Sequence, residues 1–378
     1  MADYININPT VLQWTRKSLR LDITKVAKLT KLSVEELKRI ESGDKKPNLS
    51  ELSLLAKAYN TPLATLLLYK PLKEKPLPKD RRTVNSTEIG IFDLKTIKIV
   101  ERARALLDSQ LRLKRELGLS ILKFSDSASL DNEANKIAEL FRKKWHLNEL
   151  RKLQNNDTAL EGFIEKVEDL GVAVFQLPLT KDNLRGFSII DEEIPIIVIK
   201  RGGDPPTAKI FTLFHEVGHH LLNESGICDI GLNNRQKIEM WCNAFASEIL
   251  VPTNELLQNG IVKNYINKGK KEWTSKDLVD IGNKFFVGRL VILKKIYDLR
   301  LTTKSYYEEK LKSWNKPSFG RSKEPEGRNI AKEIVKERGK TFISLAFDAY
   351  RQNRINIKEL SDFLGAKLIY IPKIRHYL

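Results

Sequence analysis

The chain has 378 residues, of which 41% are apolar and 30% are charged, a composition typical of a globular protein long enough for two or three domains. Lys and Arg outnumber Asp and Glu by 66 to 48, and the net charge of +18 favours polyanionic partners such as nucleic acid, although a solvated basic surface has the same composition. Two cysteines exclude a disulfide framework, no apolar run is long enough to span a membrane, and "MADYININPT" lacks the pattern of a signal peptide. We therefore expect a cytoplasmic protein with no membrane partner.

Five short helices are predicted within residues 1–70. Asn, Asp, Ser or Thr residues precede most of them, as is typical of helix N-caps. Ser33 and Glu36 have the spacing of a capping box at the start of the third helix, which is expected to end near Gly43. The prediction is a compact helical domain. The five segments are "NPTVLQWTRKSLR", "DITKVAKLTK", "LSVEELKRIESGD", "NLSELSLLAKAYN" and "TPLATLLLY".

Residues 71–92 are predicted to be a linker, because "KPLKEKPLPKDRRT" combines prolines with charged residues and cannot pack. A second domain is expected over residues 93–260. It opens with basic amphipathic helices, then has three short β-branched runs, "VAVFQL", "RGFSII" and "IPIIVIK", and then the apolar helix "TAKIFTLFHEVGHHLL". Further helical regions are expected at 261–315 and 316–378, so the predicted fold class is α+β, mostly α, with one small sheet.

The stretch "FTLFHEVGHHLLN" holds three of the five histidines of the chain. His215 and His219 are one helical turn apart, so both imidazoles can reach one cation. Glu216 follows the first of them, where its carboxylate can reach a water on the open side of the metal. This HExxH arrangement is typical of two Zn²⁺ ligands and a general base. His220 points about 100° away from His219 and is expected to be a packed or supporting residue.

A catalytic zinc ion needs a third protein ligand. A third histidine at the extended HExxHxxGxxH spacing is excluded, because residues 222 and 225 are Leu and Ser. The downstream candidates are Cys228, Asp229, Glu239 and Glu248. We favour Glu239, because Asn243 lies one turn further on the same predicted helix face and could support the metal site from behind.

The pair of segments "FTLFHEVGHHLL" and "IEMWCNAFASEILVP" resembles the ImmA/IrrE family of metallopeptidases. The stretch "LGVAVFQLPLTKDNLRGFSIIDEEIPIIVIK" resembles the sheet that precedes the active helix of that family. The resemblance implies a gluzincin-like zinc endopeptidase in which His215, His219 and Glu239 bind Zn²⁺ and Glu216 is the catalytic base. The strand near Arg185, Gly186 and Phe187 is a candidate for pairing with an extended substrate.

Residues 21–67 resemble the XRE, or Cro/CI-like, helix-turn-helix module, with Leu32 and Ser33 at the turn. Such a module places the start of its recognition helix in the major groove of DNA. Glu35 and Glu36 depart from the pattern expected of a phosphate-binding helix, although Glu can accept from cytosine. The alternative is a module for substrate docking or for dimerisation, giving a homodimer. The candidate DNA-binding residues are Lys25, Ser33, Glu35, Lys38, Arg39, Lys45 and Lys46.

Two functions follow from these motifs. The first is a zinc-dependent, site-specific endopeptidase that regulates by cleaving a protein partner, such as a repressor or an antitoxin, and that binds DNA through its N-terminal module. The second is a DNA-binding transcriptional regulator or antitoxin whose metal site is sensory or structural and not proteolytic. Residues 276–304 also resemble a helix-turn-helix region that follows the peptidase in this family, and we assign no DNA contact to them.

Overall fold

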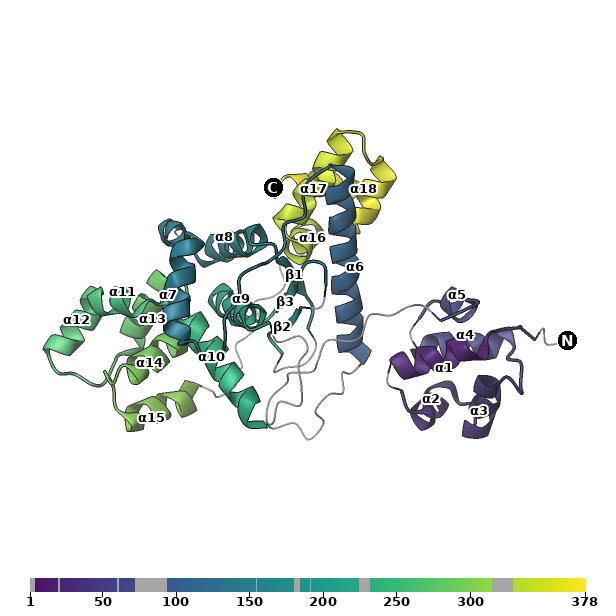
Figure 1. Ribbon diagram of the computed structural model, residues 1–378, viewed down its shortest axis with the longest axis horizontal. Coiled ribbons are helices and arrows are strands. Elements are labelled where there is room, and N and C mark those ends of the chain that lie inside the picture. Colours follow the sequence, from purple (N-terminus) through teal and green to yellow (C-terminus); the bar gives the residue numbers. More distant parts are fainter. Residues whose placement is uncertain are drawn as a thin grey trace. The chain divides into compact units, whose positions relative to one another are not determined.

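The computed structural model describes residues 4–19, 21–59, 61–71, 94–153, 155–179, 184–190, 192–223, 232–314 and 329–378. The chain forms two compact units, Met1–Lys98 and Ile99–Leu378 (Figure 1). Most of the predicted linker, residues 72–92, lies outside the described residues. No helix in the described part of the chain is both long and apolar enough to cross a membrane.

The N-terminal unit contains the five predicted helices. Asn8, Asp22 and Ser33 cap the first three with their side chains, and the predicted capping box between Ser33 and Glu36 is present. The third helix ends at Gly43, which has the left-handed φ of 88° that favours glycine. The helices are α1 (Pro9–Ser18), α2 (Ile23–Thr30), α3 (Val34–Ser42), α4 (Leu49–Tyr59) and α5 (Leu63–Leu66).

These five helices enclose one apolar core, to which Leu12, Val26, Leu37 and Leu52 contribute from four different helices. One buried ion pair crosses this unit. Arg16 of α1 donates to both carboxylate oxygens of Glu41 at the end of α3, at 2.7 and 2.8 Å. A bidentate pair of this kind fixes the angle between two helices as well as their separation.

The second unit is built around a three-stranded sheet. The strands are β1 (Ala173–Leu177), β2 (Gly186–Ile189) and β3 (Ile196–Lys200), in the order β1-β3-β2. β1 runs parallel to β3, whereas β2 runs antiparallel to it, with Gly186 opposite Ile199. In the described sheet, β2 is therefore an edge strand that pairs only with β3.

The remaining elements of this unit are helical. The first group is α6 (Leu94–Glu116), whose first turn belongs to the N-terminal unit, α7 (Ala134–Lys144), η1 (Leu147–Lys152), α8 (Asn156–Asp169), α9 (Pro206–Leu221) and α10 (Leu232–Leu250). They are followed by α11 (Thr253–Gln258), α12 (Gly260–Asn267), α13 (Ser275–Phe285), α14 (Arg289–Asp298) and α15 (Lys304–Trp314). The last group is α16 (Ile330–Arg338), α17 (Lys340–Arg351), α18 (Ile357–Leu364), η2 (Leu368–Tyr370) and α19 (Ile371–Arg375).

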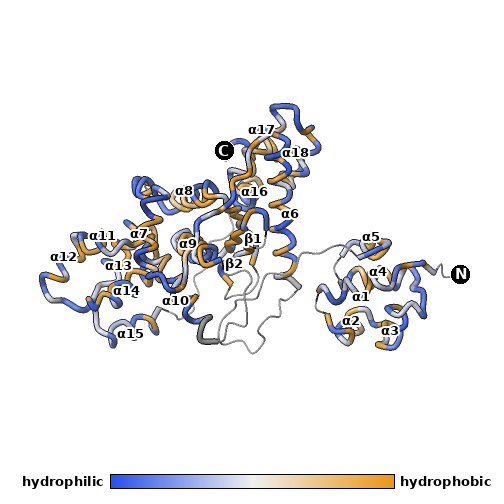
Figure 2. The backbone as a smooth tube through the Cα atoms, in the orientation of Figure 1, coloured by the Kyte–Doolittle hydropathy of each residue, from blue (hydrophilic) through white to orange (hydrophobic). Residues whose placement is uncertain are grey.

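The main core of the second unit lies between the sheet and α9. Ile197 and Ile199 of β3 pack in the same apolar cluster as Leu213, Phe214 and Val217 of α9. Figure 2 shows hydrophobic residues along the strands and hydrophilic residues on the outer turns of the helices. The fold is therefore mostly helical with one small sheet, as the sequence predicted, and the sheet supports the helix that carries the histidine motif.

The C-terminal helices α16 to α19 have a second, smaller core. It contains Phe342, Leu360 and Ile374 together with Leu113, which belongs to the distant helix α6. α16 also packs against β1. The C-terminal helices and α6 thus form one group, in which α6 lies beside α16, α17 and α18 (Figure 1).

Candidate metal centre and nucleic-acid interface

Helices α9 and α10 bring together the three side chains that the sequence proposed as metal ligands. Nε2 of His215 lies 3.2 Å from Oε2 of Glu239, and Nε2 of His219 lies 3.4 Å from Oε1 of the same carboxylate. The two Nε2 atoms are 3.2 Å apart. A tetrahedral Zn²⁺ ion with bonds of about 2.0–2.1 Å keeps its ligand atoms about 3.3 Å apart, so the donor set fits that ion.

The electrostatics of the cluster also suit a cation. Burial acts to raise the pKa of Glu239, but the hydrogen bonds with His215 and His219 hold it well below its usual range. Burial acts to lower the pKa of His215, yet the contact with Glu239 and the charge of Glu216 raise it above its ordinary value. The cluster therefore keeps a charged carboxylate beside two imidazoles, and a metal ion would replace the proton that this arrangement favours.

Asn243, the proposed supporting residue, contacts the ring of His215. Its Oδ1 lies 3.0 Å from Nδ1 of His215. With the proton on Nδ1, the imidazole donates to this oxygen and directs the lone pair of Nε2 toward Glu239 and His219. His220 is different, because it is buried against the edge of Phe124, with ring centroids 6.2 Å apart, and it is not among the clustered ligand atoms.

The predicted base, Glu216, is buried beside the edge strand β2. A β-carbon built on Gly186 would lie 3.6 Å from Oε1 of Glu216, 2.6 Å from Thr212 and 2.9 Å from the carbonyl of Val198. Only glycine fits this close approach of strand and helix. Phe187 points to the other face of the sheet and Arg185 is exposed at the start of the strand.

Glu248, the competing carboxylate, has a different role. It is buried at the end of α10, where it forms an ion pair with Lys295 of α14 and accepts hydrogen bonds from the amide and hydroxyl of Thr253, both at 2.8 Å. The carboxylate oxygens of Glu248 therefore contact Lys295 and Thr253, and they do not join the cluster of His215 and His219. The other two alternatives, Cys228 and Asp229, lie outside the described residues.

The N-terminal unit presents part of its predicted DNA-binding set to solvent. Lys25, Glu35, Lys38 and Arg39 are exposed on α2 and α3, as are Ser33 at the turn and Lys46 after α3. Glu36, by contrast, is occupied within the unit, since it accepts from the Ser33 amide and lies 3.1 Å from Nζ of Lys45. Glu36 is therefore committed to the capping box of α3 and to Lys45.

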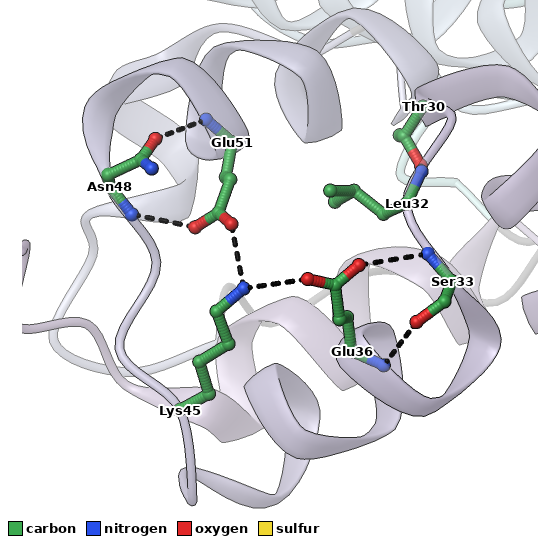
Figure 3. A network of polar contacts seen from close by, with 7 residues as sticks. All are labelled: Thr30, Leu32, Ser33, Glu36, Lys45, Asn48 and Glu51. Atoms are coloured by element: carbon green, nitrogen blue, oxygen red, sulfur yellow. Dashed lines mark hydrogen bonds and ion pairs between the residues drawn. The ribbon is translucent and has the colours of Figure 1, made fainter.

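Lys45 joins the two helices that flank it. Its ammonium group also lies 2.8 Å from Glu51 of α4, and Glu51 and Asn48 cap each other's amides (Figure 3). The carboxylates of Glu51 and Glu36 raise the pKa of Lys45. The sequence proposed Lys45 as a contact for a DNA phosphate. Its ammonium charge is instead neutralised within the unit by the carboxylates of Glu36 and Glu51.

The second helix-turn-helix-like region has three of its basic residues engaged within its own unit. The guanidinium of Arg289 lies 4.1 Å from the ring centroid of Trp314, Lys295 is buried with Glu248, and Lys294 pairs with Asp298. These three side chains of α14 therefore have partners inside the second unit.

The geometry gives a candidate metal centre in the second unit and a five-helix first unit, and comparisons with known families find a related domain in each. Residues 167–267 match the family model of the IrrE N-terminal-like domain, a peptidase family, and residues 12–66 match a helix-turn-helix model. The chain thus carries an IrrE-type peptidase-family domain together with an XRE-type helix-turn-helix, as its motifs predicted. A search of curated proteins found no match.

Proposed function

We propose that this chain is a zinc-dependent endopeptidase that acts as a regulator, cleaving a protein partner such as a repressor or an antitoxin and binding DNA through its N-terminal helices. One observation carries the proposal: the convergence of His215, His219 and Glu239 next to a buried glutamate and the edge of a sheet. A purely structural metal site does not require an additional carboxylate, such as that of Glu216, beside an edge strand.

Bound Zn²⁺ would supply Lewis acidity and a water molecule acidified to a pKa of about 7. Glu216 would take the proton of the attacking water and transfer it to the leaving amine nitrogen. The edge of β2 would pair with the backbone of an extended substrate, and Gly186 would let that backbone lie within reach of Glu216. Asn243 would keep His215 in the tautomer that binds metal.

The test is Glu216→Gln, which keeps the shape of the side chain and removes its basicity. Wild type and variant are expressed in cells, their cleavage products are compared by mass spectrometry, and the zinc content of both proteins is measured. We expect equal zinc and loss of the cleavage products in the variant. If the variant processes partners as well as wild type does, the metal site is sensory or structural and the peptidase proposal is wrong.

A further inference from the structure

Helix α6 reaches the connection between β2 and β3 through a buried ion pair. Nε of Arg104 lies 2.8 Å from Oε1 of Glu192, and only 14% and 1% of the two side chains are exposed. Glu192 stands between the end of β2 and the start of β3. A second pair, between Arg115 of α6 and Glu193, spans 3.1 Å but is exposed, so it holds this connection more weakly.

The side chains of Arg104 and Glu192 are both largely out of water, so substituting either one leaves its partner in a poorly solvated place with one counter-charge fewer. α6 is itself anchored at several points to the C-terminal helices. Leu113 lies in their apolar core, Arg112 pairs with Glu359 at 3.2 Å, and Arg102 pairs with the buried Glu337 of α16. Arg104 therefore connects a helix that is held by the C-terminal group to the segment between β2 and β3.

Strand β2, which precedes the connection that Arg104 contacts, is short. β2 has four residues and, in the described sheet, pairs along one side only. Its first residue, Gly186, lies against Thr212 and Glu216 of α9 with no room for a β-carbon. Small movements of β2 would therefore change the distance between its backbone and the carboxylate of Glu216.

We propose that Arg104 is a positioning residue for substrate binding, which acts through Glu192 to hold β2 at the separation from Glu216 that an extended peptide requires. This inference rests on the proposed endopeptidase function and on substrate pairing with β2. It assigns a role in substrate binding to α6, a helix that contributes no ligand and no base. The expected signature is a change in KM rather than in kcat, because the base and the metal ligands stay in place.

The test compares full-length, zinc-loaded Arg104→Gln, Glu192→Gln and the double variant with wild type. The control is Asp108→Asn, which removes an exposed charge from the same helix. Hydrogen exchange of the amides of residues 186–189 reports the order of β2 without any substrate. Kinetics use a peptide selected from a peptide library because wild type cleaves it and Glu216→Gln does not, and thermal unfolding shows whether each variant is folded.

Each single variant should exchange its β2 amides about tenfold faster and raise KM about tenfold, with kcat and zinc content nearly unchanged. The double variant should change exchange and KM by less than the two single changes combined, because the pair between Arg104 and Glu192 is lost only once, and Asp108→Asn should behave as wild type. Unchanged exchange and KM in an active enzyme, additive effects in the double variant, or a loss confined to kcat would each overturn the role of Arg104. Absence of any peptide cleaved by wild type would instead overturn the endopeptidase function.

Discussion

Gly218 of α9 lies directly against Cys242 of α10. A β-carbon built on Gly218 would be 3.2 Å from the α-carbon, the β-carbon and the sulfur of Cys242. The two helices therefore pack tightly one residue before His219 on α9 and one residue before Asn243 on α10. This contact sets the separation between the helix that carries the two histidines and the helix that carries Glu239.

Gly218→Ala should separate α9 from α10 by a few tenths of an ångström and weaken both folding and metal binding. The added methyl group meets backbone and buried side-chain atoms, and such overpacking costs about 1–3 kcal/mol. The measurements are thermal unfolding and competitive zinc titration. Gly260→Ala is the matched control, since a β-carbon there meets nothing within 4 Å, and a loss of zinc affinity in that control would point to a general effect of alanine.

Asn243→Ala should reduce zinc affinity by about 10–100-fold while leaving three ligands in place, because it removes the group that orients the imidazole of His215. His219→Ala should reduce zinc affinity much further, since it removes a ligand atom. Titration against a chelator of known affinity separates the two cases. Equal affinities in wild type and Asn243→Ala would show that the 3.0 Å contact with His215 has no part in metal binding.

Glu248→Gln should retain zinc and lose stability. The substitution leaves the ammonium of Lys295 buried without its counter-charge, which costs about 3–5 kcal/mol. The double variant Glu248→Gln/Lys295→Met should recover much of this loss, because it removes both charges. Denaturant unfolding and zinc content, measured on the same samples, test whether Glu248 stabilises the fold and does not bind zinc. Loss of zinc in the folded single variant would indicate that Glu248 is a zinc ligand.

The local features of this fold follow from short sequence patterns. The spacing of His215 and His219 predicts a shared helix face, and Ser33 with Glu36 predicts a helix start, because both depend on residues within one turn of each other. The order of the strands, with β3 in the middle, and the pairing of Glu248 with Lys295 depend on residues far apart in the chain. No local pattern indicates which of the two candidate carboxylates, Glu239 or Glu248, will find a lysine partner 47 residues away.

Salt dependence should separate the lysines of the DNA-binding unit. Lys38→Ala removes an exposed charge from α3 and should lower the slope of log K against log salt by about 0.9, the value for one phosphate contact. Lys45→Ala should leave that slope nearly unchanged and lower the melting temperature instead, because Lys45 joins Glu36 to Glu51. The probe is an operator duplex selected from random DNA. An equal loss of slope in both variants would mean that Lys45 leaves its carboxylates to contact phosphate.

Glu168 gives the second unit a pH-dependent stability. Its carboxyl end is enclosed next to α17, where it accepts from the hydroxyl of Thr341 at 2.6 Å, and burial raises its pKa from 4.5 to about 8. The folded state therefore holds a proton that the unfolded state releases above pH 4.5. It follows that this contribution is complete below about pH 4.5 and is lost progressively as the pH rises to about 8.

Glu168→Gln, which stays neutral, should match wild type near pH 5 and be more stable than wild type at pH 8. The exposed Glu139→Gln is the control. Parallel stability curves for wild type and Glu168→Gln in denaturant unfolding between these pH values would show that Glu168 is ionised in the folded protein.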